Sequence, residues 1–155
     1  MNIRIPRRKF LLAAGGMAAG MVAVTISKAA AATEAEMKDA IGKVVGTSIV
    51  TKGKVTLDLP PLVDNGNAVP LSVRVDSPMT AADHVKAIYL FNEKNPLPNI
   101  VTFRLGPRAG RASVSTRIRL ADTQTVVAIC EMSDGSFWSG SVNVVVTVAA
   151  CSEDR

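Results

Sequence analysis

Two cysteines are the residues of this chain best suited to covalent chemistry, and they lie in very different surroundings. Cys130 belongs to the apolar run "TVVAICEM", where Val126, Ala128 and Met132 share its face at strand spacing. This pattern predicts that Cys130 is a small packing residue inside a strand. Cys151 comes after the valine-rich run "SVNVVVTVA" and before the polar residues "SEDR", so it is expected to be an exposed free thiol.

The residues beside Cys151 are small. Ala149 and Ala150 precede the sulfur and Ser152 follows it, and residues 149–155 are predicted to form a C-terminal carrier arm. An arm without bulky side chains before its sulfur can enter a narrow channel in another protein, deliver what the sulfur holds and withdraw. The thiolate, which forms with an ordinary pKa of about 8.5, is nucleophilic enough for persulfide or disulfide chemistry.

Motifs for catalysis or for resident ligands are missing from the sequence. His84 is the only histidine, so it is not expected to form a metal site with two scattered cysteines. No serine lies in a nucleophile elbow and no glycine-rich loop joins a strand to a helix for phosphate binding. The sequence therefore predicts a protein that is not itself an enzyme, with no metal and no cofactor. His84 is expected to lie exposed or at a strand edge.

The elements that would hold the cysteines follow from the periodicity of the chain. Residues 33–46 have apolar side chains at helical spacing, acids in the first turn and Gly46 at the end, which predicts one short helix. After Gly46 the apolar residues alternate in about seven short runs separated by turn residues. This pattern favours an all-β, immunoglobulin-like sandwich over residues 32–148. The predicted strands span residues 54–59, 71–76, 84–91, 100–105, 111–120, 125–132 and 141–149.

Two of these strands carry side chains that could bind a partner. Ala87–Phe91 is apolar on both faces, so it needs a second sheet or another chain to cover it, and a stable heterodimer is expected. The run 111–120 places arginines on its outward face, with Arg104 and Arg108 near in sequence. They could steer anions or dock a partner, although a solvated face that discourages edge-to-edge pairing explains them better. The outward arginines are Arg111, Arg117 and Arg119.

The first residues of the chain have the pattern of an export signal, predicted over 1–31. A basic head is followed by an apolar stretch from Phe10 to Ile26 and by small residues. Arg7 and Arg8 precede "KFLL", which resembles the twin-arginine motif that exports folded proteins across the bacterial inner membrane. An ordinary secretion signal is the alternative. The stretch is too weakly apolar for a membrane anchor, so we expect a periplasmic protein without a membrane segment once the signal is removed.

The basic balance of the chain arises in that same segment. Five of the 18 lysines and arginines lie in the predicted signal, while all 13 aspartates and glutamates follow it. The mature chain would therefore have 13 positive and 13 negative side chains, and its overall charge gives no indication of nucleic-acid binding.

Several long blocks of the sequence are similar to one known family. They are "VPLSVRVDSPM", "LFNEKNPLPN" and "FRLGPRAGRASVSTRIRLADTQTVVAICEMSDGSFW", together with the twin-arginine signal and a cysteine after a valine-rich strand. On these residues the mature chain resembles the SoxY family, the sulfur-carrying subunits of the thiosulfate-oxidising Sox system. The resemblance covers nearly the whole chain.

The resemblance implies a function that composition alone does not. Members of the family have an immunoglobulin-like sandwich and pair with a SoxZ-like subunit. A haem c-containing enzyme conjugates their terminal cysteine to thiosulfate, a sulfate-releasing hydrolase acts next, and in some organisms a molybdenum-containing sulfur dehydrogenase follows. By position, Cys151 corresponds to the cysteine that bears the thiosulfate or sulfane sulfur adduct.

The arm departs from the family pattern, and two other functions remain to be weighed. The usual arm is Gly-Gly-Cys-Gly or close to it, whereas this one reads Ala-Ala-Cys-Ser. A structural or adhesive module with a Cys130–Cys151 disulfide is one alternative, but the tail would have to fold back to bring the two Cα atoms within about 7 Å. A rhodanese-like enzyme is another, and the acidic pair Glu153 and Asp154 beside the cysteine argues against it.

Overall fold

The change of periodicity after Gly46 separates a helix from a β-sandwich, as predicted. The structure is a computed structural model that describes residues 33–150 of the chain. Helix α2 spans Glu34–Val45 and begins with a capping box, in which the Glu36 amide donates to the Thr33 hydroxyl and the Thr33 amide donates to the Glu36 carboxylate. The helix ends at Gly46, whose φ of +59° is a conformation that glycine adopts readily.

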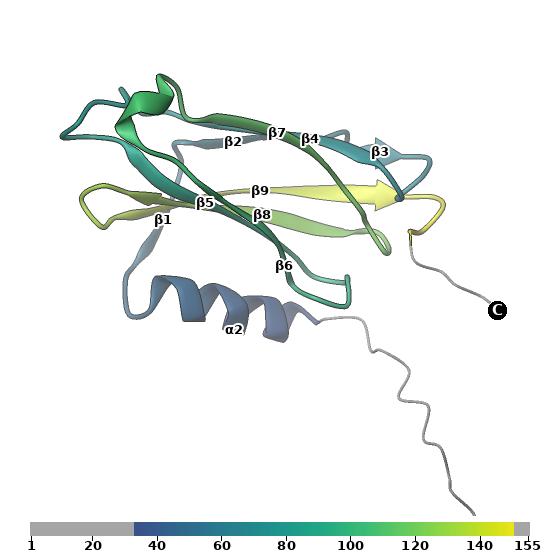
Figure 1. Cartoon of the computed structure of the whole chain (residues 1–155). Coiled ribbons are helices and arrows are strands. Elements are labelled where there is room, and N and C mark those ends of the chain that lie inside the picture. The colour runs from purple at the N-terminus through teal and green to yellow at the C-terminus, as the bar shows by residue number, and fades with distance from the viewer. Residues whose placement is uncertain (1–32, 151–155) are drawn as a thin grey trace, which may run out of the picture.

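Two sheets pack face to face, and α2 lies outside the larger one (Figure 1). The larger sheet has the order β1-β9-β8-β5-β6, with β3 also paired to β9, and the smaller has the order β2-β4-β7. The strands of the larger sheet are β1 (Val50–Lys52), β3 (Leu62–Val63), β5 (Val85–Asn92), β6 (Asn99–Arg104), β8 (Gln124–Met132) and β9 (Phe137–Val146). The smaller sheet contains β2 (Val55–Asp58), β4 (Val69–Val75) and β7 (Ser113–Ile118), and a short 3-10 helix, η1 (Pro107–Ala109), precedes β7.

The described residues thus form nine strands, while the sequence predicted about seven. The additional strands, β1 and β3, contain three and two residues, too few to show an alternating pattern. Both pair in parallel with β9, one near its start and one at its end. These pairings join distant parts of the chain, and no local sequence signal predicts them.

The strand periodicity sorts side chains between the core and the surface. In β4, buried residues alternate with more exposed ones along the whole strand, and the buried ones enter the core between the sheets. In β8, Val126, Ala128, Cys130 and Met132 all point into the same core. The predicted shared face of that strand is therefore confirmed.

The second apolar face of β5 is covered by the chain itself. Ile88 and Leu90 pack in the core between the sheets, whereas Phe91 packs with Ile129 and with Met37 of α2 on the other side of the larger sheet. The sequence predicted that a second sheet or another chain covers Ala87–Phe91. The smaller sheet lies over one face of β5, as predicted, and the other face is covered without another chain. The helix predicted from the sequence supplies that cover, which the periodicity of β5 alone could not indicate.

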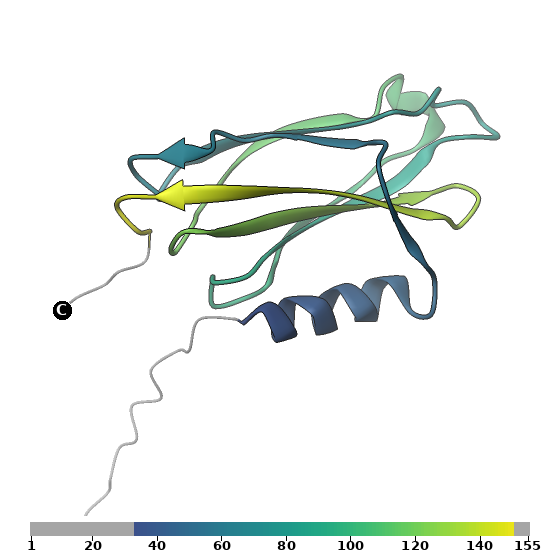
Figure 2. The same ribbon diagram turned by 180° about the vertical axis from the view of Figure 1, so that it is seen from behind.

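The two ends of the sandwich differ in what they hold. Seen from behind, the arrowheads of β3 and β9 reach the same end, where the described chain stops (Figure 2). The β8–β9 hairpin and η1 lie at the opposite end (Figure 2). Within residues 33–150 no helix is long and apolar enough to cross a membrane. The predicted signal, residues 1–31, lies outside the described residues.

Candidate functional site at the base of the C-terminal arm

The folded domain continues further toward Cys151 than the sequence suggested. Ala149 is half-buried and Ala150 is only 1% exposed, so both alanines pack against the domain, although the sequence predicts an arm that begins at Ala149. Cys151 and Ser152 lie outside the described residues, as do Arg7 and Arg8 of the export motif. The cysteine therefore follows directly on Ala150, a buried residue and the last one that the structure describes.

A chain of three backbone hydrogen bonds links Ala150, Leu120, Gly66 and Val148, and we call this arrangement the arm clasp. The Ala150 amide donates to the Leu120 carbonyl at 2.9 Å, and the Leu120 amide donates to the Gly66 carbonyl at 2.9 Å. The Gly66 amide in turn donates to the Val148 carbonyl at 2.8 Å. Three segments that are distant in sequence thus meet at the base of the arm.

Gly66 is a glycine because no side chain fits at the centre of the clasp. A Cβ atom at this position would lie 2.2 Å from the Leu120 carbonyl oxygen and 2.8 Å from the Ala150 nitrogen. Both neighbours are backbone atoms, which cannot rotate away. The reason for glycine here is the close approach of two other chain segments.

The end of β9 is secured by further contacts just before the clasp. The Thr147 amide donates to the Val63 carbonyl at 3.0 Å, and the Thr147 hydroxyl donates to the Asp64 carbonyl at 3.1 Å. The Val146 amide donates to the Thr123 hydroxyl at 3.0 Å. The chain is thereby tied on two sides before it reaches Ala150.

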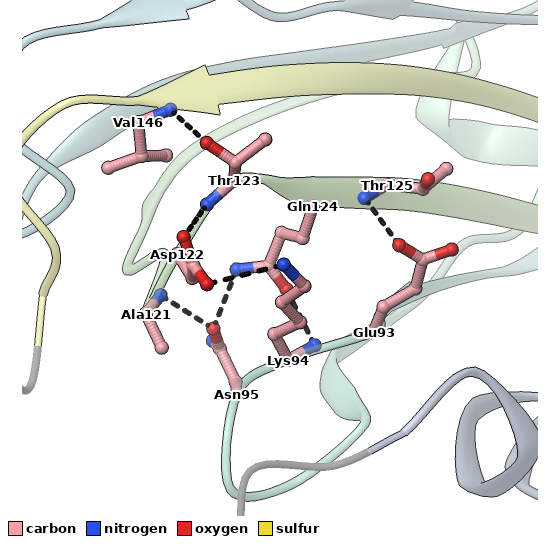
Figure 3. A network of polar contacts seen from close by, with 9 residues as sticks. All are labelled: Glu93, Lys94, Asn95, Ala121, Asp122, Thr123, Gln124, Thr125 and Val146. Carbon is pink, nitrogen blue, oxygen red and sulfur yellow. Dashed lines mark hydrogen bonds and ion pairs between the residues drawn. The ribbon is translucent and has the colours of Figure 1, made fainter.

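A network of polar side chains supports the loop that contains Leu120 (Figure 3). The Asn95 side-chain oxygen accepts from the Ala121 amide at 2.9 Å and from the buried Gln124 side chain at 3.0 Å. The Asn95 side-chain nitrogen donates to the Arg119 carbonyl at 2.8 Å. Asn95 therefore bonds to the residues on both sides of Leu120 and fixes the carbonyl that receives the Ala150 amide.

Further contacts join the loop after β5, residues 93–98, to the loop before β8, residues 119–123 (Figure 3). Lys94 forms an ion pair with Asp122 at 3.2 Å, and its backbone amide donates to the Gln124 side chain at 2.9 Å. The Thr123 amide and Lys94 together hold the pKa of Asp122 below its usual value. The Thr125 amide donates to the Glu93 carboxylate at 2.9 Å. The block "LFNEKNPLPN" thus serves as a support for the block "LADTQT".

Cys130 is unsuited to chemistry in the folded protein. Its side chain is fully buried, and its sulfur lies 3.7 Å from the Met132 sulfur. Burial, with a smaller effect from the charge of Glu131, raises the pKa of the Cys130 thiol to about 12. At neutral pH Cys130 is therefore protonated and inaccessible, as its strand position predicted.

Cys130 is also far from the arm clasp. A Cβ on Gly66 would contact both Ala150 and Val146, which places the clasp at the Val146 end of β9. Cys130 pairs with Trp138 near the other end of that strand. Between Trp138 and Val146 a strand advances about 26 Å, whereas the Cα atoms of a disulfide lie within about 7 Å. A Cys130–Cys151 bridge would require the clasp to open and part of the sandwich to unfold.

The other residues that the sequence singled out, the arginines of the run 111–120 and His84, are not part of the clasp. The predicted outward arginines of the run 111–120 are all exposed, and β7 is an edge strand of the smaller sheet. His84 precedes β5, half-buried, with a ring nitrogen 3.1 Å from the Thr80 carbonyl. Among residues 33–150, no three His, Cys, Asp or Glu side chains gather into a group that could hold a metal ion.

The fold and the site together define a β-sandwich domain in which a buried residue, Ala150, immediately precedes a cysteine. The family model of the sulfur oxidation protein SoxY matches residues 41–151, a match that ends at Cys151. The chain belongs to the SoxY family.

Solved structures give the same result for the fold. The sulfur carrier protein SoxY from Chlorobium limicola f. thiosulfatophilum is 25% identical, with a TM-score of 0.62, covering 74% of this chain and 98% of its own. A superoxide reductase (neelaredoxin) from Ignicoccus hospitalis is 16% identical, with a TM-score of 0.54, covering 61% of this chain and 80% of its own. A superoxide reductase from Nanoarchaeum equitans is 10% identical, with a TM-score of 0.52, covering 62% of this chain and 100% of its own.

The likeness to the two reductases concerns the fold alone, since their identity is low. A comparison with curated protein sequences found no match.

Proposed function

We propose that this protein is a periplasmic carrier of sulfur compounds, in which Cys151 holds thiosulfate-derived sulfur while other enzymes act on it. The observation that supports this most directly is the anchoring of Ala150, 1% exposed, immediately before that cysteine. A cysteine attached to a fixed point at the edge of a stable domain is suited to presenting its sulfur to other proteins. The buried Cys130 offers no competing nucleophile.

The chemistry of the carrier is a cycle of bonds at one sulfur. Joining the Cys151 thiolate to thiosulfate forms a sulfur–sulfur bond and releases two electrons, which the haem c-containing partner enzyme accepts. Hydrolysis of the adduct then releases hydrogen sulfate and leaves a persulfide on Cys151. A sulfur dehydrogenase, where one is present, would oxidise that persulfide further. The carrier itself needs no cofactor for these steps, because the partners supply the catalytic groups.

Export would accompany this function. The paired Arg7 and Arg8 support a twin-arginine route, which transports folded proteins and would allow a SoxZ-like subunit without its own signal to be exported as part of a heterodimer. Because α2 already covers the outer face of the larger sheet, we propose that such a subunit binds a different surface.

Intact-protein mass spectrometry tests the carrier function. The protein would be isolated without reductant from cells that are oxidising thiosulfate, and the adduct would be located by peptide mapping. We expect added mass of thiosulfate or sulfane sulfur on the peptide that contains Cys151 and none on Cys130. An intramolecular Cys130–Cys151 peptide without any free thiol would instead support a structural module. Turnover of thiosulfate by the isolated protein with an added acceptor would support a rhodanese-like enzyme.

A further inference from the structure

The arm clasp restricts where the Cys151 sulfur can go. Ala150 is buried and its amide is bound, so its Cα is a fixed point of the domain. Consecutive Cα atoms lie about 3.8 Å apart, and two further bonds reach the sulfur, so the sulfur lies within about 7 Å of that point. A free arm that began at Ala149 would give the sulfur a longer reach in every direction.

We propose that Gly66 is a positioning residue for sulfur transfer, because it allows the clasp to close and thereby fixes the starting point of the carrier arm. This inference rests on the proposed function of Cys151. A partner enzyme then meets the sulfur in a small volume at one end of the sandwich instead of searching for it at the end of a flexible tail. Holding a reacting group near its productive position lowers the entropic cost of reaction.

The contacts of Gly66 support this role over a purely structural one. Its carbonyl and amide are both used in the clasp, toward Leu120 and Val148. The two atoms that lie nearest to an added Cβ, the Leu120 oxygen and the Ala150 nitrogen, also belong to clasp residues. Leu120 is held independently, because Asn95 bonds to its neighbours Arg119 and Ala121. The loop opposite Gly66 therefore cannot easily move aside, and an added Cβ would instead displace Ala150.

The chain offers two matched controls for Gly66→Ala. Gly140 is equally crowded, since a Cβ there would lie 2.4 Å from the Val55 carbonyl oxygen, but it lies in β9 where β2 crosses it. Gly140→Ala therefore reproduces the steric conflict away from the arm. Gly106 has extended backbone and nothing within 4 Å of an added Cβ, so Gly106→Ala controls for the substitution itself.

The first measurement is hydrogen exchange at the Ala150 amide in the full exported protein. We expect this amide to be protected in the wild type, in Gly140→Ala and in Gly106→Ala, and to exchange at least about tenfold faster in Gly66→Ala. Ala150→Pro removes the same donor without altering Gly66, and it serves as a second variant if Gly66→Ala fails to fold. Rapid exchange of this amide in the wild type would show that the clasp does not hold Ala150, and the proposal would fail.

The second measurement compares a partner enzyme with a small reagent at Cys151. For Gly66→Ala or Ala150→Pro we expect kcat/KM for thiosulfate loading to fall about tenfold, while iodoacetamide modifies Cys151 at least as fast as in the wild type. Unchanged loading, or an equal fall in Gly140→Ala, would overturn the positioning role. If the wild type itself acquired no adduct at Cys151, the proposed function would fail, and the exchange data would still decide whether the clasp exists.

Discussion

In the proposed function Cys151 is the reactive cysteine, whereas Cys130 packs in the core, and single substitutions should separate these two properties. We expect Cys151→Ser to abolish thiosulfate-dependent oxygen uptake in a reconstituted system while the free energy of unfolding changes by no more than about 0.5 kcal/mol. The reason is that, in the proposed function, Cys151 carries the sulfur adduct and belongs to an exposed arm, where a substitution changes stability little. Activity assays paired with urea unfolding measure both effects. A loss of several kcal/mol, as after breaking a disulfide, would contradict the assignment.

Cys130→Ala should have the opposite outcome. Removing a fully buried sulfur that contacts Met132 should cost about 1 kcal/mol or somewhat more, and sulfur loading should be unaffected. Urea unfolding and peptide mapping of the adduct provide the measurements. Loss of the adduct in this variant would show that the cysteine roles are reversed.

The raised pKa of Cys130 adds a dependence on pH. Its folded pKa is about 12, whereas an unfolded cysteine ionises near pH 8.5, so the unfolded chain loses its proton first. This contribution to stability is complete below about pH 8.5 and is lost as the pH rises toward 12. We expect the decline in stability above pH 8.5 to be smaller in Cys130→Ala than in the wild type. Equal declines would indicate that the thiol is not shielded.

At the scale of elements, the loop after β5 holds the loop before β8, and Asn95 is the main link. Asn95→Ala should lower the free energy of unfolding by about 2 kcal/mol, because the Ala121 amide and the Gln124 side chain lose their shared acceptor. Asn143→Ala, an exposed position in β9, is the control and should change stability by no more than about 0.5 kcal/mol. Chemical denaturation of both variants checks this, and similar values for the two would refute the structural role of Asn95.

The pairing of β5 with β8 also contains an acid-sensitive contact. Glu131 accepts from Lys86 and, at 3.0 Å, from the Tyr89 hydroxyl, and these bonds lower the pKa of Glu131, with Lys86 the larger cause. The stabilising contribution is present above the unfolded pKa of about 4.3 and is lost as the pH falls through the lower folded value. We therefore expect Glu131→Gln to be less stable than the wild type at pH 7, with the difference shrinking on acidification. A difference that does not vary between pH 7 and pH 3 would contradict this.

The sequence predicted elements well where one segment determines its own structure. The helix over 33–46 and the alternating strands, including the buried face of Cys130, follow from local periodicity. The clasp could not be predicted in this way, since it joins Gly66, Leu120 and Ala150 through backbone atoms, which leave no pattern of side chains. The blocks around Asn95 and Gln124 carry the resemblance to the SoxY family, but the hydrogen bond between their side chains is visible only in three dimensions.

The molecule as a whole is a three-layer arrangement in which both faces of the larger sheet are covered within one chain. Stability therefore need not depend on a partner. We expect the mature chain, expressed alone, to unfold cooperatively, and its elution volume to shift to that of a heterodimer when a SoxZ-like subunit is added. Size-exclusion chromatography and thermal unfolding test this. Aggregation of the mature chain alone would show that a further apolar surface needs cover, and an unchanged elution volume would argue against the proposed heterodimer.

The two short strands β1 and β3, which pair with β9 on the side away from β8, have a mechanical consequence. In the proposed function, a partner that departs while it still holds the adduct on Cys151 would pull on the chain that leads back into β9. Because β9 lies between β8 on one side and β1 and β3 on the other, the hydrogen bonds on both sides are loaded together in shear, and cannot be unzipped one at a time. The strand β9 is thus the one best placed to withstand tension, and under load the hydrogen bond from the Ala150 amide to Leu120 would yield before the sandwich does.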